Sequence, residues 1–199
     1  TTDARISVQF HAPTRTLQPG KHPLNLGTDT RDGFLFIPDI ARTSAVPLIV
    51  LLHGASGSAS TWNSLLATAD ALGFAILAPD SRGQTWDYRT GGFGPDIRFI
   101  EDALAFTVDR VNIDPARVAL GGFSDGGTYG LSIGLNNGDL FKRLIGFSPS
   151  VPLELEARGK PPIFIAHGTF DSVLPVEHTR DVTVPRLRGD GYVVRYDEF

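Results

Sequence analysis

Short apolar runs alternate with longer amphipathic stretches along the chain from about residue 47 onward. The run PLIVLLHG, 47–54, is almost continuously aliphatic, which is typical of a strand buried on both faces of a sheet. Further runs that predict strands lie at 74–80, 117–123, 143–149, 161–168 and 192–199. Strands that alternate with helices favour a mostly parallel central sheet with helices on both faces. The pattern therefore predicts the α/β class.

The stretches between these runs predict four helices. Residues 61–73 end on Gly73, which suits a C-cap, and carry an apolar face that comprises Trp62, Leu65, Leu66, Ala69 and Leu72. The other helices are expected from about 97 to 111, over 125–137 and within 176–191. Asp96 is well placed to cap the helix that starts near 97, and Pro185 is expected to disturb the last one.

The first forty-odd residues carry a weaker pattern. The stretches ARISVQF, 4–10, and GFLFIP, 33–38, predict two antiparallel edge strands that are joined by a loop rich in proline and glycine. Internal repeats, low-complexity tracts and linkers are absent from the sequence. We expect one domain over 1–199.

Composition narrows the class of protein further. A chain of 199 residues that is 41% hydrophobic can bury a substantial core, and it contains no cysteine for disulfides or thiolate metal sites. The net charge is −4 and the basic residues are scattered, which argues against binding nucleic acid or anionic lipid and favours a small-molecule partner. No apolar run is long enough for membrane insertion and 1–10 contains no leader, so we expect a soluble protein and favour the cytoplasm, with a secreted form left open.

The stretch LGGFSDGGTYG, 120–130, surrounds Ser124 with glycines between a predicted strand and a predicted helix. A sharp turn there strains the central residue and brings its neighbours at minus two and plus two close together. Gly122 and Gly126 are small enough for those two positions. We therefore predict that Ser124 is a nucleophile, and the alternative is a turn that only packs.

A serine nucleophile needs donors for the oxyanion and a base for its proton. We expect one donor to be the backbone N–H of Asp125 and the other to be that of Ala55, in the loop after an earlier strand. Asp171 follows a later strand, so it is predicted to orient the base, although it could also only cap its turn. We interpret His53 as a brace for its loop, and we expect no metal site at His167 and Asp171.

A long loop at 81–96 is rich in glycine and aromatic residues and is a candidate lid or pocket wall. Trp86, Tyr88 and Phe93 are candidate substrate-binding residues for an acyl or aryl group. Packing of these side chains against the body of the protein is the alternative.

Four of these segments together resemble the α/β-hydrolase superfamily: LIVLLHGASGSASTW, GFAILAPD, VNIDPARVALGGFSDGG and IAHGTFDSVLPV. They are most similar to small serine esterases of the phospholipase/carboxylesterase type and to the polyhydroxybutyrate depolymerase and feruloyl esterase-like group. The resemblance covers 47–199. It implies hydrolysis of a small-molecule carboxylic ester through an acyl-serine intermediate, without a cofactor. Ser124 would attack, Asp171 would orient a histidine, and Ala55 and Asp125 would form the oxyanion hole.

The histidine of the implied triad is missing from its usual place. The family carries it just after the last strand, and this sequence stops at YVVRYDEF, 192–199, so we expect the histidine and a closing helix beyond Phe199. Among the five histidines present, His178 is a weak substitute. A non-catalytic binding module with a degenerate triad, or a thioesterase or peptidase on the same scaffold, remains the alternative.

Overall fold

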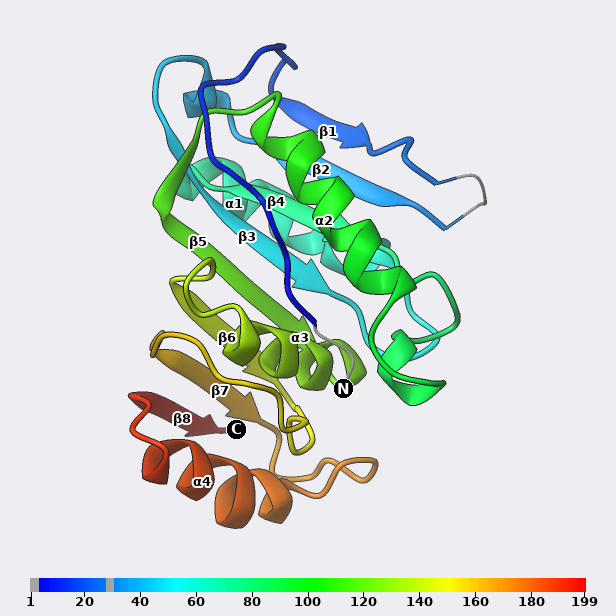
Figure 1. Cartoon of the computed structure of the whole chain (residues 1–199), viewed down its shortest axis with the longest axis vertical. Helices are drawn as coiled ribbons and strands as arrows, with labels where there is room; N and C mark the ends of the chain where they lie inside the picture. Colours follow the sequence, from blue (N-terminus) through cyan, green and yellow to red (C-terminus); the bar gives the residue numbers. More distant parts are fainter. Residues whose placement is uncertain (1–3, 28–30) are drawn as a thin grey trace.

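The computed structural model describes residues 4–27 and 31–199, and within them eight strands form one sheet (Figure 1). The strand order is β1-β2-β4-β3-β5-β6-β7-β8. The strands are β1 Gly20–Pro23, β2 Gly33–Ile37, β3 Val46–Leu52, β4 Ala75–Pro79, β5 Ile113–Phe123, β6 Arg143–Phe147, β7 Ile163–His167 and β8 Val194–Glu198. The first two pair in the antiparallel sense and the other six are parallel. The predicted mostly parallel sheet with antiparallel strands at one edge is therefore confirmed, but β1 lies in the stretch that was predicted to be a loop.

Helices cover both faces of this sheet. The helical elements are η1 Asp39–Arg42, η2 Ala59–Leu65, α1 Leu66–Leu72, η3 Asp87–Arg89, α2 Pro95–Val108, α3 Asp125–Asn136, η4 His178–Thr183 and α4 Val184–Gly189. Figure 1 shows α2 and α3 in front of the sheet and α1 behind it. The core on the α2 and α3 side is the larger, and Trp62 and Ala69 of η2 and α1 anchor a smaller one behind.

The predicted helix over 61–73 forms as a 3-10 segment that continues into α1. Gly73 ends it in the left-handed region, at φ 73°, and its N–H donates to the carbonyl of Asp70, so the predicted C-cap is confirmed. Leu72 is 72% exposed, so its assignment to the apolar face was wrong. Near the other end of the chain, the π-helical η4 stops directly before α4, which carries Pro185 in its first turn. The predicted disturbance is therefore present.

Two further local predictions fail for physical reasons. Residues 4–10 form no strand, because their backbone is bonded to side chains of the helical layer. The N–H of Ile6 donates to the side chain of Asn137, which caps the end of α3, and the N–H of Ser7 donates to Glu101 of α2. The alternating apolar side chains there face helices, and β2 pairs with β1 instead. Asp96 does not cap α2, since Gly94 is the N-cap and the Asp96 carboxylate accepts from other backbone N–H groups.

Across 4–27 and 31–199, no helix is both long enough and apolar enough to span a membrane.

Candidate active site

Ser124 occupies the turn between β5 and α3 with φ 54° and ψ −119°. A non-glycine residue in this region is strained, and such strain is held only where the surroundings fix it. The N–H of Ser124 donates to the Phe147 carbonyl at 2.9 Å, and its own carbonyl accepts from the N–H of Thr128 at 2.9 Å. The side chain is partly exposed, and its hydroxyl has no hydrogen-bond partner in the part of the chain described.

The two glycines that flank Ser124 are required by space. A Cβ on Gly122 would lie 2.3 Å from the Gly126 carbonyl oxygen, and a Cβ on Gly126 would lie 2.3 Å from the carbonyl oxygen of His53. Neither glycine has a positive φ, so the demand is for close approach rather than for a special backbone conformation. The end of β5, the start of α3 and the end of β3 are therefore in close contact at this point.

His53 braces the loop that follows β3, as predicted. The ring is fully buried, Nδ1 lies 2.7 Å from the Gly54 carbonyl oxygen, and Nε2 lies 3.0 Å from the donating N–H of Ser81. Nδ1 must then carry the proton and Nε2 must accept. Burial lowers the pKa of His53, so the ring is neutral near pH 7 and fixes two backbone segments.

The predicted oxyanion donors lie on the two segments that meet at the elbow. A Cβ on Gly54 would lie 3.4 Å from Cβ of Ser124, so the start of the loop that carries Ala55 is against the turn. Asp125 is the first residue of α3. Within 4–27 and 31–199, neither the Ala55 N–H nor the Asp125 N–H donates a hydrogen bond. Both groups are free to donate, and their role as an oxyanion hole stays a prediction.

Asp171 lies in the loop after β7, two strands from Ser124 at the same carboxyl edge of the sheet. Its Oδ1 accepts from the N–H groups of Val173 at 3.0 Å and Leu174 at 2.9 Å. Burial alone would raise the pKa of Asp171, but these two donors, together with the nearby His167 and a hydrogen bond from the Ser148 side chain, hold the pKa below the usual range. The residue is an ionised turn cap here, and its predicted role in orienting a base is untested.

The histidines available to serve as a base do not meet Ser124. His167 is buried and braces the Asp171 loop, with Nε2 donating to the Leu174 carbonyl at 2.8 Å and lying 3.4 Å from Oδ2 of Asp171. His178 is exposed at the start of η4. In the part of the chain that the structure describes, no imidazole is hydrogen-bonded to the Ser124 hydroxyl.

The aromatic loop 81–96 is packed onto α3 through Tyr129. The Tyr129 ring stacks on Trp86, Phe93 and Tyr88, with ring centroids 5.1, 5.4 and 5.7 Å away. Trp86 has no exposed surface, and its Nε1 donates to the His53 carbonyl at 2.8 Å. Packing is therefore the role that the contacts describe for Trp86, and substrate binding by the three predicted residues stays a prediction. Nothing in the sequence around Tyr129, which lies five residues after Ser124, indicates that its side chain packs against this loop.

Two carboxylates tie the same loop together from inside. Asp96 accepts from the N–H groups of Arg82 at 2.5 Å and Asp87 at 2.7 Å, and Asp87 accepts from the Tyr129 hydroxyl at 3.0 Å. Burial raises the pKa of Asp96 to about 6, the Asp87 charge adds to the rise, and the two N–H donors oppose it. Folding therefore favours the protonated form of Asp96.

This raised pKa predicts a pH-dependent stability. Asp96 contributes most below its unfolded pKa of about 4, and the contribution is lost as the pH rises through about 6. Relative to Asp96→Asn, the wild-type free energy of unfolding should fall by about 2 kcal/mol between pH 4 and pH 7. Urea unfolding at several pH values measures it, with Asp102→Asn as the control because Asp102 is exposed on the same helix. An unchanged difference between wild type and Asp96→Asn across that range would contradict the assignment.

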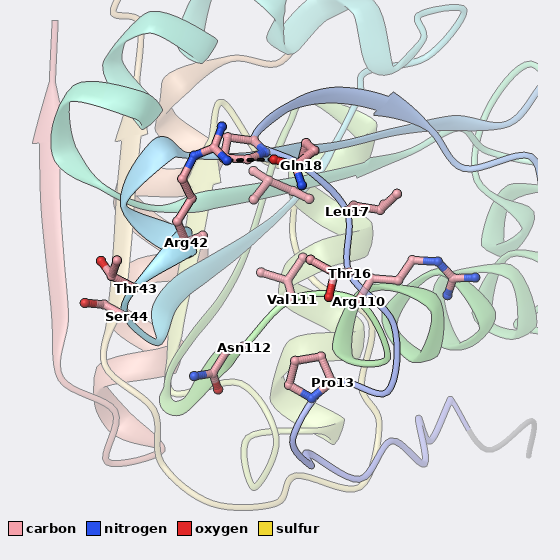
Figure 2. Close-up of a pocket in the computed structure, with 13 residues that line it drawn as sticks. Pro13, Thr16, Leu17, Gln18, Arg42, Thr43, Ser44, Arg110, Val111 and Asn112 are labelled. Atoms are coloured by element: carbon pink, nitrogen blue, oxygen red, sulfur yellow. Dashed lines mark hydrogen bonds between the residues drawn. The ribbon is translucent and has the colours of Figure 1, made fainter.

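One hollow of about 460 Å³ lies away from these residues. Figure 2 shows its lining, where Arg42 donates to the Gln18 side chain at 2.6 Å and Arg110 extends from the end of α2. None of the predicted site residues lines it. A second hollow of about 420 Å³ adjoins the elbow and is mostly apolar: its lining is Thr61, Trp62, Ser64, Leu65, Phe123 and Phe147.

A serine on a strained strand-to-helix turn, at the carboxyl edge of a mostly parallel eight-stranded sheet, is the arrangement of the α/β-hydrolase fold. The model of the α/β hydrolase family matches residues 49–197. The chain belongs to this family.

Two known proteins with esterase in their names are similar in sequence over 54% and 72% of the chain. Feruloyl esterase B of Thermothelomyces thermophilus is 33% identical over 118 residues, which cover 54% of this chain and 38% of that protein. A bifunctional acetylxylan esterase/xylanase of Neocallimastix patriciarum is 33% identical over 157 residues, 72% of this chain and 22% of that protein. The match thus spans well under half the length of either relative.

Solved structures agree with the fold assignment. A thermostable esterase superposes with a TM-score of 0.67 at 27% identity, over 83% of this chain and 50% of that one. FphF, a fluorophosphonate-binding serine hydrolase of Staphylococcus aureus, gives a TM-score of 0.72 over 91% of both chains. At 15% identity the second likeness supports the fold alone.

Proposed function

We propose that this protein is a serine hydrolase that cleaves carboxylic esters through an acyl-serine intermediate. The observation that supports the proposal is the strained backbone of the partly exposed Ser124, on a turn where the segments that carry two unused backbone N–H groups meet. Strain at one residue persists when a site needs that residue in a fixed place. Relatives that are named esterases support the choice of an ester as substrate.

The reaction would proceed in two steps, acylation and deacylation of Ser124. A base takes the proton of the Ser124 hydroxyl as the oxygen attacks the ester carbonyl carbon, and the tetrahedral intermediate places its oxyanion against the N–H groups of Ala55 and Asp125. The intermediate then collapses, and the alcohol leaves with the proton. Water attacks the acyl-serine in the same way, which releases the acid and restores the serine.

The N–H of Asp125 would carry much of the charge stabilisation. It stands at the first position of α3, where the helix macrodipole also favours negative charge. One oxyanion donor of this kind contributes about 3 kcal/mol to the transition state. Ala55 would supply the second donor from the loop that His53 braces.

We propose that the base is a histidine that follows Phe199 in the full-length protein and that Asp171 orients it. The N–H of Phe199 donates to the His167 carbonyl at 3.2 Å, and its carbonyl accepts from the N–H of Thr169 at 2.8 Å. The end of β8 therefore lies beside the loop that carries Asp171. The ionised state of that carboxylate, which its low pKa maintains, is the state that stabilises an imidazolium.

Turnover of a matched set of substrates tests this function. The full-length protein should hydrolyse p-nitrophenyl acetate with kcat/KM at least about 10-fold above the corresponding thioester and anilide, which is the preference expected of a site that selects esters. Faster thioester or anilide cleavage would favour the thioesterase or the peptidase. No turnover of any substrate would leave the binding module.

A further inference from the structure

The carboxylate of Asp125 makes contacts that oxyanion binding by its N–H does not explain. The side chain is only 10% exposed and accepts hydrogen bonds from the Thr85 hydroxyl at 2.5 Å and the Tyr88 hydroxyl at 3.0 Å. Nε of Arg89 lies 3.5 Å from the same carboxylate. All three partners belong to the loop 81–96, so one side chain of α3 attaches that loop directly beside the nucleophile.

The same stretch of loop also holds the segment with the other oxyanion donor. The carbonyl of Gln84 accepts the N–H of Ser56 at 2.7 Å, and Nε1 of Trp86 donates to the His53 carbonyl at 2.8 Å. Thr85 lies between these two residues in sequence. Ser56 is itself held at φ 57°, which is strained for a residue other than glycine and needs such a fixed partner. Ala55 therefore sits between two positions that the loop fixes.

We propose that the Asp125 carboxylate is a positioning residue that, through Thr85 and Tyr88, sets the Ala55 N–H at the right distance from the Asp125 N–H for one oxyanion. This inference rests on the proposed function. Asp125 would then act on both donors of the site. Its backbone N–H is the first donor, and its side chain positions the second donor, the N–H of Ala55. The pair then moves as one unit with α3.

Charge and position make opposite predictions for this carboxylate. A negative charge one residue from Ser124 opposes the oxyanion, so its field alone would make a neutral substitution accelerate the reaction. Loss of the anchor would slow the reaction, because a donor displaced by about 1 Å costs up to about 100-fold in rate. The sign of the rate change therefore separates the effect of charge from the effect of position.

The hydroxyl of Tyr88 is able to act as a donor in this anchor. The burial of Tyr88 and the Asp125 charge both raise the pKa of Tyr88, so its hydroxyl stays protonated and donates.

The test compares Asp125→Ala, Asp125→Asn, Thr85→Val and Tyr88→Phe in the full-length protein. Steady-state hydrolysis of p-nitrophenyl acetate gives kcat and KM, and the rate of reaction with a fluorophosphonate reports on the nucleophile. We expect Asp125→Ala to lower kcat by about 10- to 100-fold with KM changed by less than about 2-fold. Asp125→Asn keeps one acceptor oxygen and should retain an intermediate kcat. Asp102→Ala, an exposed acid of α2, is the control and should match wild type.

Thr85→Val and Tyr88→Phe keep the proposal testable even if the Asp125 variants do not fold. Each removes one hydroxyl and leaves the backbone of Asp125 intact. Each should lower kcat less than Asp125→Ala does, and each combined with Asp125→Ala should add little further loss. A wild-type or raised kcat in a folded Asp125→Ala, or in both hydroxyl variants, would overturn the inference while wild-type turnover still supports the hydrolase. Absence of wild-type turnover would instead overturn the proposed function, and the positioning role with it.

Discussion

Replacing Gly126 with alanine should destabilise the protein by about 3 kcal/mol or more. The new Cβ would lie 2.3 Å from the carbonyl oxygen of His53 and 2.4 Å from that of Leu52. Both oxygens belong to the backbone at the end of β3, so no side chain can rotate away to relieve the contact. The start of α3 would have to move off the sheet, and the backbone strain at Ser124 would lose the support that maintains it.

Chemical unfolding of Gly126→Ala and of Gly130→Ala measures this effect with a control on the same helix. A Cβ on Gly130 would meet Leu52 Cδ1 at 3.6 Å, which is an ordinary contact. Gly130→Ala should therefore be neutral or should stabilise α3 by up to about 1 kcal/mol through helix propensity. Equal stability of the two variants would mean that the helix does not press on β3 as described.

Replacing Ser124 with alanine should abolish ester hydrolysis in the full-length protein, with a loss in kcat of about 10⁴-fold or more. The hydroxyl oxygen is the atom that forms the acyl bond in the proposed mechanism, and the neighbouring N–H groups can only stabilise a charge once that bond forms. The backbone at φ 54° is held by main-chain hydrogen bonds that alanine keeps. The free energy of unfolding should consequently change by less than about 1 kcal/mol.

Steady-state kinetics with p-nitrophenyl acetate measure the loss, and Ser60→Ala is the matched control. Ser60 is exposed in η2, and its hydroxyl contacts that of Ser58. Its removal should leave kcat within about 2-fold of wild type. Substantial remaining activity in Ser124→Ala would assign the reaction to another group.

The sequence predicted the central sheet well because its signal is local. β3 and β4 are largely buried, and their aliphatic runs LIVLL and AILA are visible in the sequence whatever their neighbours are. The elbow was predictable for a similar reason, since Gly122 and Gly126 must be small at fixed distances from Ser124 in the chain. These constraints act within a few residues, so a single sequence displays them.

The failures arise where a distant partner decides the structure. The alternating pattern of residues 4–10 was interpreted as a strand, but the N–H of Ile6 donates to the side chain of Asn137, which is 131 residues away in the sequence. Asp96 has the right residue type for a cap, yet a nearby loop supplies better donors. The stacking of Trp86 on Tyr129 likewise depends on the fold bringing them together.

The most direct test of the central claim is to identify the atom that a mechanism-based inhibitor modifies. The full-length protein is treated with a fluorophosphonate and digested, and the adduct is located by tandem mass spectrometry. If Ser124 is the nucleophile, one phosphonyl group should be found on Ser124, and both the adduct and the turnover should be absent from Ser124→Ala. A protein that turns over esters while its adduct lies on a different residue, or while Ser124 stays unmodified, would contradict the account.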